Sequence, residues 1–411
     1  MRILSLELKR VVKSRMTWIL LVIGIALSVL ISLSVVSYAE YSYVDKDGGE
    51  ATISGLSAIR ANKKAMQPYE GEITEAKLKN VLITAQNFYK TYGDNYDFKT
   101  YHDNLAPIEH FMQMLYKVYP RTGSALEALS KVNPDEVTDF YQQRIEGQEN
   151  QLAVQYPGNK NVIRQAEKIN EKVKTPFVFQ YGYTSDASDN LEILIFLLVL
   201  ICAMIVSPVF SAEYHNGSDD ILRCTKYGRG KLSVIKILSA IIITFGLFAV
   251  CTLTFVLVVD NAYGWESLQT SAQVLSSAFS MAPFSAGQEQ ILTIAAGLLT
   301  ILAVACFTLF ISAKCQNPTT ALIIAIAFCL LPLILSNIGE GNIMNWILCV
   351  LPAGGSSSMM SSFYYQLNKT VFLQIGSFSI WAPYLIIGAC IVEIPVFFLL
   401  AVHAYCKHQA A

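Results

Sequence analysis

The sequence predicts an all-α polytopic membrane protein with six transmembrane helices and a mostly helical extracytoplasmic domain between the first two. The first observation is a mean hydropathy of +0.42 with 53% hydrophobic residues, which is too apolar for an ordinary soluble domain. The second is the distribution of charge, because residues 40–190 contain 17 of the 30 Lys and Arg and 21 of the 31 Asp and Glu. A polar domain is therefore inserted into a membrane protein.

The N-terminal segment, 1–15, is expected to form an amphipathic helix on the cytoplasmic face of the membrane. Its apolar side chains share one helical face and its cations lie largely opposite. The candidate interfacial residues are Arg2, Lys9, Arg10 and Lys13. Residues 16–36 are uncharged and long enough for a first crossing. A cleaved signal peptide is the alternative, but this apolar run is longer than a typical signal sequence contains.

The polar region, 40–190, is expected to fold as the extracytoplasmic domain. Apolar residues recur at three- and four-residue steps from 73 to 89 and from 108 to 118, the period of a helix. Asn133, Pro134 and the two acids that follow have the composition of a helix start. We expect three to five helices. The tyrosines of this region either pack a modest core or form a recognition surface.

Five further apolar segments are long enough to cross a bilayer. They cover residues 193–212, 237–259, 291–313, 319–336 and 383–405. Between the last two, residues 341–375 contain an apolar piece too short to cross, followed by Pro352 and two glycines. We expect this segment to be re-entrant or interfacial on the extracytoplasmic side.

Cations in the short connections set the orientation. Segments 1–15 and 213–236 contain five Lys and Arg each, and Lys314 and Lys407 follow the fourth and sixth spans. The short loops on the other side contain a single cation, Lys369. Because cytoplasmic loops are enriched in Lys and Arg, both termini are expected in the cytoplasm of a multi-pass protein of the cell membrane.

The sequence contains no pattern typical of an enzyme. GxxxxGK[ST], HExxH and GxSxG are absent, and the five histidines lack metal-ligand spacing. We therefore expect no catalytic residues, no metal site and no nucleic-acid partner. None of the nine cysteines lies in 40–190, which excludes a disulfide scaffold there. Glu393, inside the sixth span, either contacts substrate or hydrogen-bonds a neighbouring helix.

The loop 213–236 is the most informative segment. Ser218, Asp219 and Asp220 are expected to cap a short helix, to which Ile221 and Leu222 add an apolar edge. Such a helix at the inner face can dock into a soluble partner, although a plain basic turn that fixes topology is the alternative. Glu213, just past the second span, is expected to pair with Arg223 or Lys226, or with a basic partner.

The order of these parts resembles the permease subunits of ABC-2 type ATP-binding-cassette exporters. The loop is the specific part of the resemblance, and its matching residues are Glu213, Gly217, Ile221-Leu222, Tyr227-Gly228-Arg229 and Lys236. Arg223-Cys224 departs from the family pattern, where small polar residues are common. The outer domain matches in place and size only.

The resemblance implies a mechanism and partners. Two permease chains pair as a homodimer or heterodimer in the lipid bilayer, and each binds a cytoplasmic ABC ATPase subunit. ATP and Mg²⁺ are bound by that ATPase, so no cofactor is expected on this chain. Residues 219–227 would be the coupling helix, and 1–15 would also touch the ATPase. The residues implied in coupling are Glu213, Asp219, Asp220, Ile221 and Leu222.

The expected function is therefore that of a permease subunit exporting a hydrophobic or amphipathic substrate such as a lipid, a peptide or a drug. A sodium-exporting permease of the same layout is an alternative. A membrane sensor with a ligand-binding outer domain is a further alternative, although the longest inner loop, 213–236, is short for an effector site. A secondary transporter or channel would be expected to have more charged residues inside the spans than Glu393 alone. A membrane enzyme is not supported by any motif in the sequence.

Overall fold

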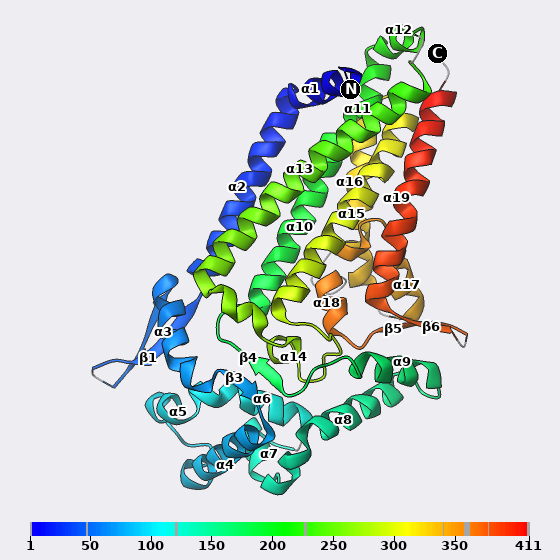
Figure 1. Cartoon of the computed structure of the whole chain (residues 1–411). Coiled ribbons are helices and arrows are strands. Elements are labelled where there is room, and N and C mark those ends of the chain that lie inside the picture. Colours follow the sequence, from blue (N-terminus) through cyan, green and yellow to red (C-terminus); the bar gives the residue numbers. More distant parts are fainter. Residues whose placement is uncertain are drawn as a thin grey trace.

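The computed structural model consists of a bundle of long helices with a separate domain at one end (Figure 1). It describes residues 2–46, 48–119, 122–225, 228–339, 341–356, 362–376 and 378–408, with only the backbone of Arg2. Within these ranges, six helical segments are long and apolar enough to cross a membrane. They are α2 (Arg15–Ser37), α10 (Ser185–Val206) continued by α11 (Pro208–His215), α13 (Gly230–Tyr263), α15 (Ala286–Lys314), α16 (Pro318–Ile338) and α19 (Ala382–Lys407).

The six predicted apolar segments each lie within one of these helices, but most of the helices are longer. The second segment was predicted at 193–212, whereas α10 begins at Ser185, where the Thr184 side chain accepts a hydrogen bond from the backbone of Ala187. Likewise α13 begins seven residues before 237 and continues to Tyr263. Hydropathy locates only the apolar part of a helix, so its polar first and last turns are missed.

The centre of the bundle is formed by α10 and α15. Gly297 of α15 permits their close approach, because a Cβ there would lie 2.8 Å from Cδ1 of Ile195 on α10. α15 also packs along α19. By contrast, few side chains of α2, α16 and α19 are buried, and apolar ones such as Trp18, Ile323 and Leu399 are exposed. Those helices therefore face lipid or another chain.

A proline break separates α10 from α11 and sets the direction of the second long helix at its end opposite the inserted domain. Pro208 is the first residue of α11, so the helix restarts there. The backbone N–H groups of Phe210 and Ser211 both donate to the hydroxyl of Ser312 on α15, each at 3.1 Å. α11 is thereby fixed against α15, and its own side chains, including Glu213, are held against the bundle.

The inserted domain contains seven α-helices among the residues described, where the sequence predicted three to five. They are α3 (Leu56–Met66), α4 (Glu75–Tyr92), α5 (Phe98–Asn104), α6 (Glu109–Val118), α7 (Ala125–Ser130), α8 (Phe140–Gln155) and α9 (Lys160–Asn170). Helices as short as α5 and α7 make too few turns to show a period. The predicted start at Asn133 is a 3₁₀ helix, η3 (Pro134–Asp139), with Asn133 accepting from the Asp135 N–H at 3.1 Å.

Phe111, Leu115 and Phe140 lie at the centre of the domain's core. Tyr119 is buried among them, and Tyr141 packs against the same cluster while its hydroxyl hydrogen-bonds to Ile73 and Phe177. Burial raises the pKa of Tyr141 to about 12, so this hydroxyl stays protonated as a donor. These tyrosines support the interpretation that tyrosine packs the core of the domain.

Among the described residues, three small antiparallel sheets depart from the all-α prediction. Each has two strands: β1 (Glu40–Val44) with β2 (Glu50–Ser54), β3 (Gly71–Ile73) with β4 (Phe177–Phe179), and β5 (Phe372–Ile375) with β6 (Phe378–Trp381). In the second sheet Gly71 lies opposite Phe179, which joins the beginning of the inserted domain to its end. Two-stranded pairs between distant segments leave little periodic signal in a sequence.

Buried Arg144 joins the inserted domain to the connection between α13 and α15, which contains η4 (Trp265–Gln269) and α14 (Ala272–Leu275). Its guanidinium donates to the carbonyls of Ala278 at 2.5 Å and Ser280 at 2.6 Å. Burial lowers its pKa only to about 10, so it remains charged at neutral pH. The neighbouring Gln148 side chain donates to the carbonyl of Phe279 at 2.5 Å. Charge-assisted hydrogen bonds thus fix this connection to α8.

The segment predicted as re-entrant folds between the bundle and the inserted domain. It contains α17 (Asn342–Val350), η5 (Gly354–Ser356), α18 (Phe363–Asn368), and the β5–β6 hairpin leading into α19, while 357–361 lie outside the described residues. η5 is buried against α10, α15 and α19. Whether the segment enters the bilayer remains a prediction.

The buried ring nitrogen of His110 is expected to make the inserted domain less stable in acid. This nitrogen, Nε2, is buried without a hydrogen-bond partner among the described residues, and the ring stacks on Phe179 at 5.9 Å. Burial lowers its pKa, opposed by the backbone of Val274 and the charge of Glu109. The unfolded state therefore binds a proton more readily, so the free energy of unfolding decreases as pH falls through 6.5 and below.

We expect the melting temperature of His110→Phe, followed by circular dichroism of the detergent-solubilised protein, to fall less between pH 7.5 and pH 5 than that of the wild type. His102→Phe is the control, because no such burial acts on that partly exposed ring. Equal acid sensitivity of the wild type and His110→Phe would contradict the assignment.

Candidate functional site

Four charged side chains join three helices at the bundle end opposite the inserted domain (Figure 1). They are Glu7 and Arg10 on α1 (Arg2–Val12), Glu213 on α11 and Lys236 on α13. Lys236 Nζ lies 2.5 Å from Glu213 Oε1 and 3.3 Å from both carboxylate oxygens of Glu7. Arg10 contacts Glu213 Oε1 and lies 2.9 Å from Glu7 Oε2. We call these four residues the charge cluster.

The charge cluster is buried on its bundle side. Glu213 is 3% exposed and Lys236 1%, so neither charge is hydrated and each depends on its partners. Because desolvation offsets much of the attraction between buried ions, such a cluster specifies geometry more than it stabilises the fold. Its geometric effect is to hold α1 against α11 and α13, so that the three helices move together.

The structure corrects one sequence prediction for this region and adds one residue that the sequence analysis passed over. Glu213 pairs with Lys236 and Arg10, whereas pairing with Arg223 or Lys226 was expected; Lys226 lies outside the described residues. Glu7 had not been singled out, although it is the only acid in 1–15. Among the predicted interfacial residues, Lys9 and Lys13 are exposed, Arg10 joins the cluster, and the side chain of Arg2 is outside the described part.

The predicted short helix is present as α12 (Ser218–Arg223), at the tip of the same end (Figure 1). Its cap differs from the prediction, because Gly217 precedes it with φ +68° and no side chain caps the helix. This left-handed conformation favours glycine and lets the chain turn sharply after α11. Asp219 and Asp220 lie in the first turn, near the positive end of the helix dipole, as predicted.

The two faces of α12 have different environments. Asp219 is 4% exposed and turned inward, and its Oδ2 lies 3.3 Å from Nε of Arg223. Asp220 is exposed, and Ile221 is 75% exposed although isoleucine is strongly apolar. Leu222 is intermediate. Of the five predicted coupling residues, Glu213 and Asp219 therefore face the protein, while Asp220 and Ile221 face outward.

Arg223, noted as a departure from the family pattern, anchors α12 to the end of α19. Its guanidinium donates to the carbonyls of Tyr405, at 2.6 Å, and His408. It also lies 4.8 Å from the ring of Tyr405, whose hydroxyl donates to the Gly228 carbonyl. The last carbonyls of a helix carry partial negative charge and lack partners within the helix, so an arginine stabilises them well. No sequence pattern pairs Arg223 with a helix end that follows it by 180 residues.

Glu393 does not belong to either group. It lies on α19, two residues before Pro395, and is partly buried. Its Oε2 has no hydrogen-bond partner among the described residues. Its assignment as a substrate-contacting or packing group stays a prediction.

Three other buried acids near the inserted domain had been missed. Glu192 on α10, Asp260 on α13 and Glu289 on α15 are each at most 5% exposed. Glu192 accepts from the backbone of Tyr364 at 2.9 Å and Asp260 from the side chain of Gln290 at 3.1 Å. They lie one or two residues outside the predicted apolar segments, so a longer estimate of each helix would have included them. Within the described ranges, no trio of His, Cys, Asp or Glu is arranged to hold a metal ion.

The comparison with protein families decides the family. Residues 14–403 match the family model described as ABC-2 family transporter protein. The chain belongs to the ABC-2 transporter family. A search of curated proteins found no match.

The match covers five of the six long helices and the inserted domain completely, and α19 as far as His403. Together with the apolar helices, it makes this ABC-2 transporter protein a multi-pass membrane protein, the transport subunit rather than a catalytic one. The matched region begins at Ser14 and so excludes α1, with Glu7 and Arg10 of the charge cluster. The remaining members of the cluster, Glu213 and Lys236, lie inside it.

We predict that Lys236→Met destabilises the transporter by about 3 to 5 kcal/mol, because it leaves the carboxylates of Glu213 and Glu7 buried beside an apolar side chain. Thermal unfolding in detergent measures the effect. The double variant Glu213→Gln and Lys236→Met removes both charges and should recover part of the loss. Lys9→Met, at an exposed position on α1, is the control and should unfold like the wild type. A Lys236→Met protein as stable as this control would show that the cluster does not form.

Proposed function

We propose that the chain is the membrane-spanning permease subunit of an ABC-2 type exporter. It moves a hydrophobic or amphipathic substrate outward, driven by ATP hydrolysis on a separate cytoplasmic ATPase that binds ATP and Mg²⁺. The observation that supports coupling is α12. It presents Asp220 and the 75% exposed Ile221 outward, while Arg223 holds its base to α19.

An exposed isoleucine beside a carboxylate, on a short helix held from behind, suits docking into a cleft of a partner protein. Apolar side chains that become buried at an interface account for much of the binding free energy. In the proposed topology this end of the bundle is cytoplasmic, which agrees with the many Lys and Arg of 1–15 and 213–236. Both termini then lie in the cytoplasm and the inserted domain lies outside.

A force applied to α12 reaches the bundle by two routes. Through Arg223 it acts on the C-terminal end of α19, and through α11 it acts on the charge cluster and hence on α1 and α13. Such linkage is what an ATPase needs in order to move the spans. We propose further that a second copy or a homologous permease covers part of the apolar surface of α2, which includes Met16, Trp18 and Ile19.

Copurification tests the proposal. The affinity-tagged chain would be isolated from native membranes in mild detergent, and copurifying ATPase activity assayed. We expect a P-loop ATPase to accompany the wild type. The double variant Asp220→Ala and Ile221→Ala should retain at least about tenfold less of it, since truncating an interface anchor costs about 2 kcal/mol or more and about 1.4 kcal/mol corresponds to tenfold.

Val154→Ala is the matched control, because Val154 is 84% exposed but lies on α8 of the inserted domain, at the other end of the molecule from α12 (Figure 1). Both variants should melt like the wild type, since all three substituted positions are exposed. Absence of any ATPase from the wild-type preparation would refute the permease assignment. Equal ATPase recovery with all three proteins would exclude α12 as the docking helix.

A further inference from the structure

Lys369 is the only Lys or Arg in the short connections on the inserted-domain side of the bundle, 261–289 and 337–381. A cation there opposes the charge asymmetry that orients the protein, so its presence has to be explained locally. Lys369 directly follows α18, on the segment that folds between bundle and inserted domain. Its surroundings indicate a binding site.

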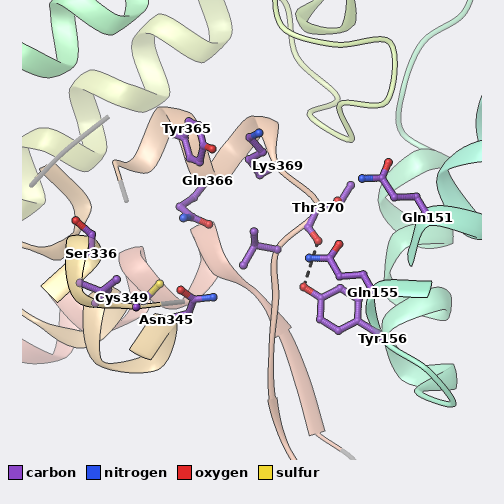
Figure 2. A pocket seen from close by; sticks show the side chains of 13 residues that line it. Gln151, Gln155, Tyr156, Ser336, Asn345, Cys349, Tyr365, Gln366, Lys369 and Thr370 are labelled. Atoms are coloured by element: carbon purple, nitrogen blue, oxygen red, sulfur yellow. Dashed lines mark hydrogen bonds between the residues drawn. The ribbon is translucent and has the colours of Figure 1, made fainter. Parts of the chain in front are cut away.

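Two adjoining cavities, of about 380 Å³ and 260 Å³, meet at Lys369. Both are lined by Gln151, Tyr365, Lys369 and Thr370, so they form one crevice between α8 and the segment after α18. Figure 2 shows Gln151, Gln155 and Tyr156 on one side and Tyr365, Lys369 and Thr370 on the other. The hydroxyl of Tyr156 donates to the Thr370 carbonyl at 3.3 Å and accepts from the Phe372 N–H at 2.9 Å, which fixes the floor.

The charged side chains that line the crevice are all positive. Lys369 Nζ lies 4.7 Å from the ring centroid of Tyr365, and Lys117 Nζ lies 5.4 Å from that of Phe279. Both lysines line the second cavity, and no Asp or Glu lines either one. Neither lysine forms an ion pair within the described part of the chain. Two exposed ammonium groups over aromatic rings, flanked by neutral amides, favour an anion.

The other end of the crevice opens beside an apolar surface. Ser336 and Gly339, at the end of α16, line the first cavity, as do Asn345 and Leu348 of α17. Along the same stretch Ile338 is 69% exposed, Ile343 76% and Ile347 44%. Exposed apolar side chains at the end of a spanning helix suit hydrocarbon chains. A ligand matching both parts has an anionic head and an apolar tail.

We propose that this crevice binds the anionic head group of a lipid-like amphiphile, with Lys369 and Lys117 contacting the head and the apolar surface of α16 and α17 contacting the chains. The amides of Gln151, Gln155 and Asn345 donate hydrogen bonds to the head group. That the bound amphiphile is the exported substrate rests on the proposed function, whereas its binding does not. On that view the crevice lies at the exit end of the transport route.

Binding is tested on the purified full-length chain in detergent, by native mass spectrometry with added phosphatidylglycerol. We expect Lys369→Gln to weaken specific binding about tenfold, Lys369 and Lys117→Gln together to weaken it further, and Lys369→Arg to retain it. Lys99→Gln, on α5 at the other side of the inserted domain, is the matched control and should bind like the wild type (Figure 1). All variants should melt like the wild type without lipid, which separates a binding role from a structural one.

Three other probes define the chemistry. Phosphatidylcholine, with no net charge, should bind at least about tenfold more weakly than phosphatidylglycerol, as expected for a charge-assisted contact. Oleate distinguishes a carboxylate head from a phosphate head, and either result is compatible with an anionic amphiphile. Inorganic phosphate alone should bind weakly, because it lacks the chains.

Equal binding of phosphatidylglycerol by the wild type and the Lys369→Gln, Lys117→Gln protein would overturn the proposal, as would equal binding of the two phospholipids. This outcome would leave the permease assignment intact if an ATPase still copurifies. Conversely, loss of lipid binding in the lysine variants of a chain that recruits no ATPase would support the crevice and refute the exporter.

Discussion

The charge cluster is the interaction on which the arrangement of this transporter's bundle end opposite the inserted domain depends. Lys236 is almost fully buried, so α13 can occupy its position only while Glu213 and Glu7 are presented to it. Glu213 is presented by α11, which restarts at Pro208 and whose first N–H groups are bound by Ser312 of α15. Glu7 is presented by α1. A single buried ammonium group thereby makes the positions of α1, α11 and α13 mutually dependent, because an unpaired buried charge is strongly unfavourable.

At the opposite end of the bundle, buried polar contacts fix the inserted domain to the spanning helices. Arg144 and Gln148 of α8 bind the carbonyls of Ala278, Phe279 and Ser280, so the connection between α13 and α15 is held by the domain and not by the spans alone. The same helix α8 supplies one wall of the crevice at Lys369. A shift of α13 relative to α15 would therefore strain the contacts of α8 and alter the crevice.

The sequence predicted what depends on local composition: six apolar helices, the amphipathic N-terminal helix and the existence of α12. It predicted neither the partner of Glu213 nor the role of Arg223, because both partners are remote in sequence and are brought together only by packing. The buried acids Glu192, Asp260 and Glu289 were missed for another reason, since they lie at polar helix turns that hydropathy assigns to loops. The two-stranded sheets were not predicted, because strands of three to five residues are too short to show a periodic pattern of apolar residues. Within the site, the sequence singled out Glu213, Asp219, Asp220 and Ile221 without indicating which way each side chain faces.

The path from α12 to the crevice runs along one helix. α19 has 26 residues, so it spans roughly 39 Å at 1.5 Å per residue. Its last carbonyls are bound by Arg223 of α12, and its first residue follows the β5–β6 hairpin, whose β5 strand begins two residues after Thr370 of the crevice. Between these ends α19 packs against α15, the central helix.

A helix is stiff along its axis, so a displacement imposed on α12 is delivered to the hairpin and not absorbed in between. Pro395 is the exception, because the missing N–H allows α19 to bend there, two residues after Glu393, whose Oε2 has no hydrogen-bond partner among the described residues.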